Sequence, residues 1–383
     1  MRRIIRRSLS SKERLLCVLQ HQEPDRIPIW MLFPRESYNA YVDVYNLPAY
    51  SEIAYYIRQH TDFFDRRSIS VPFLFTSVAQ FDHRTVVEDQ IEVTKSTLNT
   101  PYGQLIQETK RNSRSSTHWR TKYLFRQIED LEKALAIPYE PAVPDLSDFL
   151  AASKRLGDDG LMMMDLPTPV EFIGEYTAPE DFAYWIATEK DALMHFLDVV
   201  FEREYRWLEE ALQLGAGPVF FVTGTEFVAP PLASPHVFAH LSTRYNQPLF
   251  ELIHRYGCYV IVHHHGRIRA VLDQIVEAGA DGIHPIEEPP IGDMPLAEAK
   301  QILAGRTTIV GSVQYDNLAR LPDDEFEALI RRQIRDAAPG GGFILAPTAG
   351  PYEAEITSQH VRNLRRMVDL ARELGTYPLS TNI

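Results

Sequence analysis

The sequence predicts an α/β fold, a (β/α)8 TIM barrel with a β-hairpin insertion after the second strand. Short apolar runs, mostly preceded by a Gly-containing turn, alternate with helical segments through most of the chain. Apolar strands separated by helices are typical of a parallel sheet that is buried on both faces. Eight such strands can be counted, which favours a closed barrel over an open sheet. No G-x-G-x-x-G turn follows any strand, so no dinucleotide site is indicated.

The N-terminal third of the chain supplies an arm, two strands and the insertion. Residues 1–22 are expected to form a helical arm, because Ser10 and Glu13 make a capping box before the amphipathic stretch KERLLCVLQHQ. The first two strands are expected at RIPIWM and DFFDRRSIS. Residues of about 82–128 contain strand-type residues, a Pro-Tyr-Gly turn and no helical period. This pattern predicts the β-hairpin insertion.

The rest of the chain supplies six more strands and the helices between them. We expect one domain that spans residues 1–383. The predicted strands are GLMMMDLP, GPVFFVTGTEF, CYVIVHHHG, DGIHPIE, TTIVGSVQ and GGFILAPTAG. The predicted helices include residues 235–256, 267–278, 296–304 and 323–338.

The composition of the chain argues against several classes of function. The formal charge of −13 argues against nucleic-acid binding, because phosphate contacts need clustered Lys and Arg. No run approaches the ~18 apolar residues of a membrane span, and the basic start MRRIIRRS lacks the apolar region of a secretory signal. Two cysteines, Cys17 and Cys258, cannot form a disulfide framework and fit a reducing cytosol. We therefore expect a cytoplasmic protein that binds neither nucleic acid nor membrane.

The ends of two neighbouring strands carry an unusual number of imidazoles and carboxylates. Side chains alternate along a strand, so His263 and His265 share one face and His264 points to the other. Glu287 ends the next strand, one βα unit later, and two His plus one Glu is a catalytic zinc set with an open position. Glu288 is the alternative carboxylate. The other interpretation is a hydrogen-bonded histidine network that lines a polar pocket.

Other strand ends add candidates for proton transfer and substrate binding. Asp165 and Glu226 close apolar strands, where a burial-raised pKa would suit a general acid or base, and His284 is the third catalytic candidate. Gly266 is expected to open a helix whose N–H groups, with Arg267 and Arg269, could hold an anion; surface arginines are the commoner alternative. The residues expected to bind substrate are Arg35, Arg66, Arg67, Arg267, Gln314 and Tyr352.

Several longer stretches point to a known family. The opening SKERLLCVLQHQEPDRIPIW, the turn TPYG, and the stretches AGADGIHPIE and GGFILAPTAGPYE resemble the uroporphyrinogen decarboxylase-like superfamily. That superfamily includes porphyrinogen decarboxylases and zinc-dependent methyltransferases of corrinoid systems. The resemblance extends to MVDLARELG near the C-terminus. It implies a (β/α)8 barrel and a homodimer.

Departures from the family patterns favour the methyltransferase branch. Porphyrinogen decarboxylases carry an arginine-bearing RQAGR after the first strand and an aspartate after the second, whereas this chain has MLFPRESYNAY, with Arg35 alone, and RRSISVPF. The methyltransferase branch has His-x-Cys at the fifth strand and a further Cys near the eighth. Here the corresponding positions are 263–265, all His, and 348–350, Thr-Ala-Gly. Imidazole and carboxylate ligands make a harder metal, which suits an oxygen of the substrate or water.

These observations support three hypotheses. The first is a zinc-dependent methyltransferase or demethylase that works with a corrinoid protein or a small methyl carrier and acts on an oxygen-bearing methyl donor or acceptor. The second is a metal-free decarboxylase of a tetrapyrrole-like or small carboxylic acid, with arginines at the carboxylates and a histidine as proton donor. The third is a non-catalytic protein that binds a corrinoid or tetrapyrrole.

Overall fold

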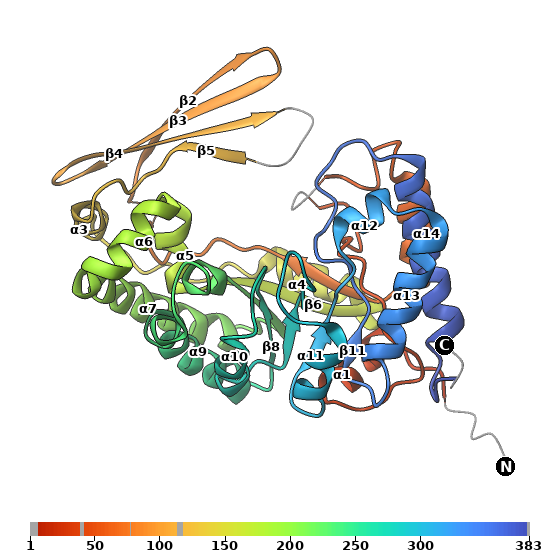
Figure 1. The fold of residues 1–383 in the computed structure, drawn as a ribbon. Helices are drawn as coiled ribbons and strands as arrows, with labels where there is room; N and C mark the ends of the chain where they lie inside the picture. The colour runs from red at the N-terminus through yellow and green to blue at the C-terminus, as the bar shows by residue number, and fades with distance from the viewer. Residues whose placement is uncertain (1–6, 39–41, 77, 113–117, 381–383) are drawn as a thin grey trace.

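The computed structural model describes residues 7–38, 42–76, 78–112 and 118–380. The chain forms a curled parallel sheet with helices around it, and a separate antiparallel sheet stands apart at one end (Figure 1). The parallel sheet has seven strands in the order β1-β6-β7-β8-β9-β10-β11. Their bounds are β1 Phe63–Arg67, β6 Gly160–Pro167, β7 Val219–Thr223, β8 Tyr259–His263, β9 Gly282–His284, β10 Thr308–Val310 and β11 Phe343–Ile344.

The predicted first strand, RIPIWM, is present as a bridge and not as a full strand. Ile29 forms an isolated parallel bridge with Leu345, just after β11. On its other side, the carbonyl of Ile29 accepts a hydrogen bond from the backbone N–H of Asp62, just before β1 (2.8 Å). The segment therefore lies between the two edge strands. The described strands form a curled half-barrel, and the complete eight-stranded barrel predicted from the sequence is not confirmed.

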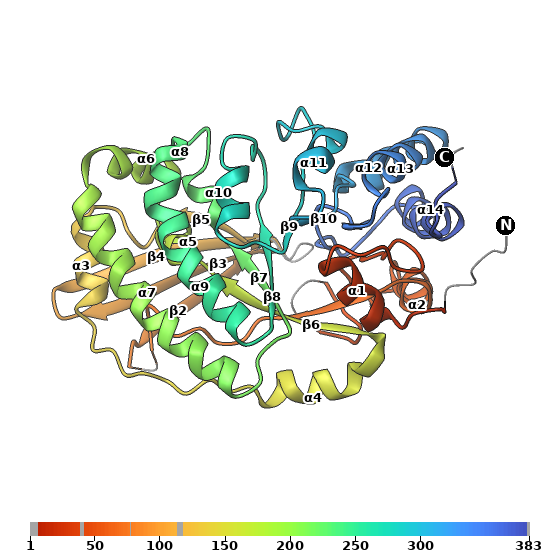
Figure 2. The ribbon, with the colours of Figure 1, turned by 90° about the horizontal axis from the view of Figure 1, so that it is seen from below.

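Helices cover the outer face of the parallel sheet, with α7 and α9 beside β7 and β8 (Figure 2). Among the described residues, no helix is long and apolar enough to cross a membrane. The α-helices are α1 Ser11–Leu19, α2 Ser51–His60, α3 Glu129–Leu135, α4 Ser147–Leu156, α5 Pro169–Tyr176, α6 Pro179–Thr188, α7 Lys190–Gln213, α8 Pro235–Phe238, α9 Arg244–Arg255, α10 Leu272–Glu277, α11 Leu296–Leu303, α12 Tyr315–Arg320, α13 Asp323–Ala337 and α14 Ser358–Leu374. Shorter turns are η1 Gly157–Asp159, η2 Thr225–Val228 and η3 Ala239–Thr243.

Of the predicted N-terminal arm, residues 1–6 lie outside the described residues, and α1 packs against β6 of the parallel sheet. The predicted capping box is confirmed, since Ser10 Oγ accepts from Glu13 N (3.1 Å) and Glu13 Oε2 accepts from Ser10 N (2.9 Å). Leu15 and Val18 of α1 belong to the same apolar cluster as the inward side chains of the strands. Burial of this helix face supplies most of its stability, because a helix of this length is marginal on its own.

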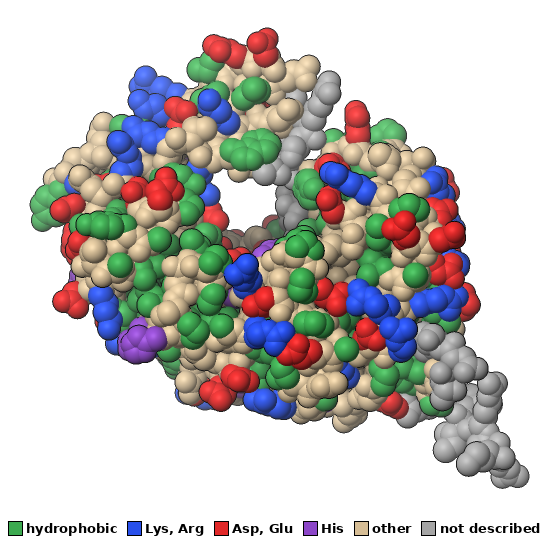
Figure 3. Space-filling model, in the orientation of Figure 1, with side chains coloured by type: hydrophobic (Ala, Val, Ile, Leu, Met, Phe, Trp, Pro, Cys, Tyr) green, Lys and Arg blue, Asp and Glu red, His purple; other side chains and the backbone are tan. Residues whose placement is uncertain are grey.

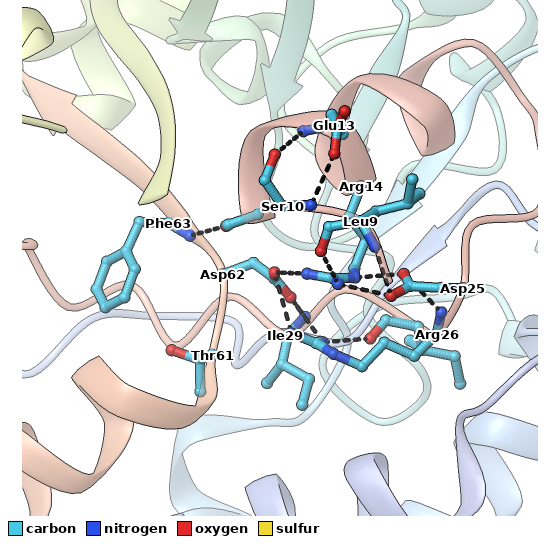
Figure 4. A network of polar contacts seen from close by, with 12 residues as sticks. Leu9, Ser10, Glu13, Arg14, Asp25, Arg26, Ile29, Thr61, Asp62 and Phe63 are labelled. Carbon is cyan, nitrogen blue, oxygen red and sulfur yellow. Dashed lines mark hydrogen bonds and ion pairs between the residues drawn. The ribbon is translucent and has the colours of Figure 1, made fainter. Parts of the chain in front are cut away.

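A buried ion-pair network ties the arm to the sheet (Figure 4). The carboxylate of Asp62 has no exposed surface. It accepts hydrogen bonds from Arg14 Nη1 (2.7 Å), Arg26 Nη1 (2.8 Å) and the backbone N–H of Ile29 (3.0 Å). Asp25 accepts two further bonds from Arg14. A buried charge is tolerated only with such partners, so this network holds α1, the Ile29 segment and β1 in register.

The insertion after β1 is larger than the predicted hairpin. It is a four-stranded antiparallel sheet in the order β2-β3-β4-β5. The predicted Pro-Tyr-Gly turn does join two of its strands, because Thr100 pairs with Gly103 across it. A single hairpin was wrong because the segment continues through two more pairings, at 81–88 and 118–122. The strands are β2 Phe81–Glu88, β3 Ile91–Thr100, β4 Gly103–Asn112 and β5 His118–Lys122.

Candidate functional site

Strand alternation brings a set of polar side chains to the carboxyl ends of the strands. Phe221 and Ile261 belong to the apolar cluster inside the half-barrel, whereas their neighbours Phe220 and Val260 belong to the outer cluster under the helices. The residue two positions after each inward side chain faces the same way. The inward positions at the strand ends are therefore Arg66, Asp165, Thr223, His263 and His284. Figure 3 shows a hollow between the antiparallel sheet and the rest of the molecule, with histidine side chains at its edge.

An aromatic floor lies beneath these polar groups. Trp30 packs edge-on against Phe64 (5.2 Å between ring centroids) and Phe221 (6.1 Å). The indole Nε1 of Trp30 is buried and has no hydrogen-bond partner among the described residues, although buried donors are nearly always paired. Leu32 has a left-handed backbone (φ 55°), which is rare outside glycine and concentrates at functional sites. A small pocket is lined by Trp30, Leu32, Phe33, Pro34, Tyr38, Phe64 and Arg66.

Two imidazoles form a hydrogen-bonded relay above this floor. His284 Nε2 lies 3.0 Å from the carbonyl oxygen of Pro347, which can only accept, so this nitrogen carries the hydrogen. His284 Nδ1 is then the acceptor of the 2.9 Å bond from His263 Nδ1. Burial, with neighbouring positive charge from His265 and Arg66, lowers the pKa of His284 to about 3, and burial likewise places the pKa of His263 well below its usual value. Both rings are neutral, and the lone pair of His263 is on Nε2.

The third member of the predicted face, His265, has the opposite character. Its Nδ1 lies 3.3 Å from Glu287 Oε2. Burial disfavours the charged imidazole, but the hydrogen bond and the charge of Glu287 outweigh it and raise the pKa of His265. Glu287 is 3% exposed and also accepts from Gly266 N (2.6 Å) and Gln314 Nε2 (2.9 Å). These bonds outweigh its burial and lower the pKa of Glu287. A hydrogen-bonded imidazole–carboxylate pair, whose imidazole has a raised pKa, therefore lies beside an imidazole whose pKa is lowered, with 4.5 Å between the ring centroids of His263 and His265.

The predicted zinc ligands are neighbours, but they are engaged with other partners. Glu288, the alternative ligand, turns away and forms a two-bond ion pair with Arg332 (2.6 and 2.9 Å). His263 Nδ1 faces His284, and His265 Nδ1 faces Glu287. In the part of the chain that the structure describes, no three His, Cys, Asp or Glu side chains are grouped so that they could hold a metal ion. The residues as arranged do not fit a zinc ion, and zinc binding stays a prediction from the sequence.

Comparison with known proteins identifies the family of this chain. The model of the uroporphyrinogen decarboxylase (URO-D) family matches residues 160–374, more than half of the chain. The chain belongs to the URO-D family. The resemblance seen in the sequence is therefore confirmed.

Solved structures show the fold of this family member more fully. A methyltransferase from Methanosarcina mazei covers 95% of this chain and 99% of its own, with a TM-score of 0.62 and 16% identity. Two sugar epimerases are much less similar, each with a TM-score of 0.32. D-psicose 3-epimerase is 10% identical and covers 60% of this chain and 93% of its own. 3-keto-D-glucoside 4-epimerase from E. coli is 15% identical and covers 61% of this chain and 97% of its own. No curated protein matches the chain.

Three of the arginines predicted to bind substrate in this URO-D protein are paired within the chain. Arg66 donates to Asp165, which also accepts from Ser68 Oγ. The guanidinium of Arg67 lies 2.8 Å from Asp65, and that of Arg35 lies 2.6 Å from Asp159. Arg66 also stacks over the ring of Phe221 (4.5 Å). The predicted proton carrier Asp165 therefore positions Arg66 at the site.

The predicted helix after the triple histidine begins later than expected, and the anion site drawn from it was wrong. The helix α10 starts at Leu272 and not after Gly266. The free N–H groups of this segment are taken by carboxylates of the chain, because Gly266 N donates to Glu287 while Ile268 N and Arg269 N donate to Asp293 Oδ1 (3.1 Å each). Arg267 is exposed, and no ion pair of its guanidinium is seen among the described residues.

The remaining predicted residues divide between the site and its surroundings. His264 turns away from His263, as predicted, and its Nδ1 meets Thr225 Oγ1 (2.8 Å). Gln314 holds Glu287, whereas the ring of Tyr352 packs on Tyr315 (4.7 Å).

Glu226 follows β7 in η2, and its Oε2 is buried without a partner among the described residues. Burial raises the pKa of Glu226, while the positive charge of His265 opposes the shift.

One acid near the site was missed by the sequence analysis. Glu171 lies in the first turn of α5, and its Oε2 is 2.6 Å from Thr223 Oγ1 at the end of β7. A Cβ on Gly224 would overlap this side chain, so glycine is required for the close approach. The available signal was an acid in the first turn of the helix that follows the strand GLMMMDLP, since helices of a parallel sheet begin at the edge where its strands end.

Proposed function

We propose that this URO-D protein is a methyltransferase or demethylase that acts on a methyl group bound to oxygen. The observation that carries the proposal is His265, whose pKa is raised by its hydrogen bond to Glu287, beside His263, whose pKa is lowered by burial. Neighbouring groups whose environments shift their pKa values in opposite directions are the usual arrangement for acid–base catalysis. The rings of Trp30 and Phe64, each 1% exposed, form an apolar floor under these groups.

The acid is needed when the bond from the methyl carbon to oxygen breaks. The methyl group moves to a nucleophile, the bonding electrons stay on the oxygen, and His265 donates the proton that makes this oxygen a neutral leaving group. Glu287 then faces a neutral His265 until a proton returns from solvent or from a neighbouring acid. A corrinoid on a partner protein would supply the nucleophile for this step.

The paired arginines favour this reaction over decarboxylation. A ligand with several carboxylates needs open guanidinium groups for bidentate anchoring. Arg35, Arg66 and Arg67 already hold Asp159, Asp165 and Asp65. Opening the pair of Arg66 or of Arg67 for a substrate carboxylate would leave a largely buried carboxylate, Asp165 or Asp65, without its cation.

Methyl transfer to free cob(I)alamin tests the proposal. The purified protein is incubated with chemically reduced cobalamin and a panel of methoxy compounds, and methylcobalamin is followed by its absorbance. A matching panel of carboxylic acids is followed for release of CO2. We expect methylcobalamin with at least one methoxy compound and no CO2. CO2 release without methyl transfer would favour the decarboxylase, and bound cobalamin without turnover the binding protein.

Variants then distinguish the loss of the acid from a general loss of the fold. We expect His265→Ala to lower the rate by about 10²–10⁴-fold, the usual contribution of a positioned acid. His195→Ala is the matched control, because His195 is an exposed residue of α7 whose nearest carboxylate, on Glu132, lies 3.6 Å away. An unchanged rate in His265→Ala would remove His265 from the chemistry.

A further inference from the structure

Two carboxyl groups behind the site, those of Glu171 and Glu204, are buried, and that of Glu204 has no hydrogen-bond partner among the described residues. Glu204 of α7 is 0% exposed, and neither of its carboxyl oxygens has a hydrogen-bond partner among the described residues. An isolated carboxylate in such surroundings is far less stable than the acid. Burial, and then the nearby charge of Glu171, raise the pKa of Glu204 well above its usual value. Glu204 is therefore a neutral carboxylic acid.

Glu171 lies between Glu204 and the mouth of the half-barrel. Its Oε2 is 2.6 Å from the hydroxyl of Thr223, an inward-facing residue at the end of β7. Burial, together with the charges of Glu226, Glu175 and Asp165, raises the pKa of Glu171 to about 8. Glu171 therefore keeps its proton at neutral pH and can release it with little cost, which is the property of a proton carrier.

The charges around Glu171 explain why its proton is held. The groups that face it are Asp165 of β6, Glu175 of its own helix, Glu226 of η2 and Glu204 of α7. Arg66 pairs with Asp165 and Arg120 pairs with Glu175. No ion pair to Glu171, Glu204 or Glu226 is seen in the described parts of the chain. The three acids run from the helix layer to Glu226, on which the positive charge of His265 acts.

We propose that Glu171, through the hydroxyl of Thr223, returns a proton to the site after each turnover. The inference rests on the proposed function, because that reaction removes one proton from His265 each time. An acid and a hydroxyl each carry one hydrogen, so the bond between Glu171 and Thr223 can run in either direction. The acid gives its proton to the Thr223 oxygen, the hydroxyl hydrogen of Thr223 passes to water at the mouth and from there to the neutral His265, and the Glu171 carboxylate regains a proton from solvent. Glu204 stays neutral and keeps the region free of charge.

The pH dependence of turnover tests the relay. Glu171 acts in its protonated form, so in the unaltered protein kcat is expected to fall as pH rises through about 8. Glu171→Gln keeps the size of the side chain and removes the proton. We expect this variant to turn over about 10-fold or more slowly and to lose the step near that pH, while Glu171→Asp recovers part of the rate and the step. Glu204→Gln is the matched control, because an amide replaces a group that stays neutral.

Infrared difference spectra provide a readout that does not depend on turnover. In a titration across neutral and alkaline pH, a carboxylic-acid C=O band is expected to disappear with a midpoint near 8, and to be missing in Glu171→Gln. An unchanged pH profile in folded Glu171→Gln overturns the relay even if the band is present. Should no methyl transfer be found with any donor, the proposed function fails and the relay with it, but the infrared titration still reports whether Glu171 holds the proton.

Discussion

At the scale of single residues, one carbonyl oxygen decides what the triple histidine can do. Pro347 O can only accept, so it fixes the hydrogen of His284 on Nε2, and the orientation passes through His284 to His263. The sequence predicted that His263 and His265 share a face and that an acid follows one βα unit later. The sequence did not show that Glu287 pairs with His265 whereas Glu288 pairs with Arg332, because the side chains of adjacent loop residues do not alternate in a fixed way.

Proton NMR of the imidazole rings tests these protonation states. The pKa of His265 is raised, so its ring should titrate above the usual histidine range, whereas His263 and His284 stay neutral down to acid pH. The stabilisation from the His265–Glu287 pair is present below the usual pKa and is lost as pH rises through the folded value. Glu287→Gln should return the pKa of His265 toward or below normal. The matched variant Glu288→Gln should leave it unchanged, and a downward shift in both would contradict the assignment.

At the scale of elements, strand periodicity was predicted and segment boundaries were less well predicted. The inward residues of β6, β7 and β8 follow a local alternation that the sequence contains in full. The start of α10 at Leu272, in contrast, depends on carboxylates of Glu287 and Asp293 that take the N–H groups of Gly266 and Ile268. The insertion has four strands instead of one hairpin because a second tight turn, at Asp89 and Gln90, joins β2 to β3. Both turn residues have positive φ although neither is glycine, so no Gly or Pro marks this turn in the sequence.

The Asp62 network is an element-scale prediction. Asp62→Ala leaves Arg14 and Arg26 without their shared partner at the junction of α1, the Ile29 segment and β1. We expect a loss of about 3–5 kcal/mol in the free energy of unfolding, the usual cost of breaking a buried pair, measured by urea titration. Asp82→Ala is the control, because its ion pair with Arg84 is exposed (3.4 Å) and such pairs contribute about 0–1 kcal/mol. Similar losses in both variants would show that Asp62 has no special role.

At the scale of the whole molecule, metal content separates the hydrogen-bonded site from the zinc site predicted from the sequence. His263 Nδ1 and His265 Nδ1 are engaged with His284 and Glu287. We therefore expect less than one equivalent of zinc by elemental analysis of protein purified without added metal, and the same imidazole NMR spectrum after chelation. One equivalent of tightly bound zinc that is lost in His263→Ala, but not in His195→Ala, would restore the metal set. The homodimer, the corrinoid partner and the cytoplasmic location stay predictions.

By itself the sequence determined the α/β class, the capped N-terminal helix, the family and the strand ends at which the site lies. These follow from periodicity and spacing, which act between residues a few positions apart. Only the tertiary structure decided which groups are paired: His284 with Pro347, Glu287 with His265, Arg66 with Asp165, and Glu171 with Thr223. A hydrogen bond requires its two atoms within about 3 Å, and the two partners of each pair come from different strands, helices or connecting segments. The distance between the two partners is set by how the elements pack, and this distance decides which groups hold a proton.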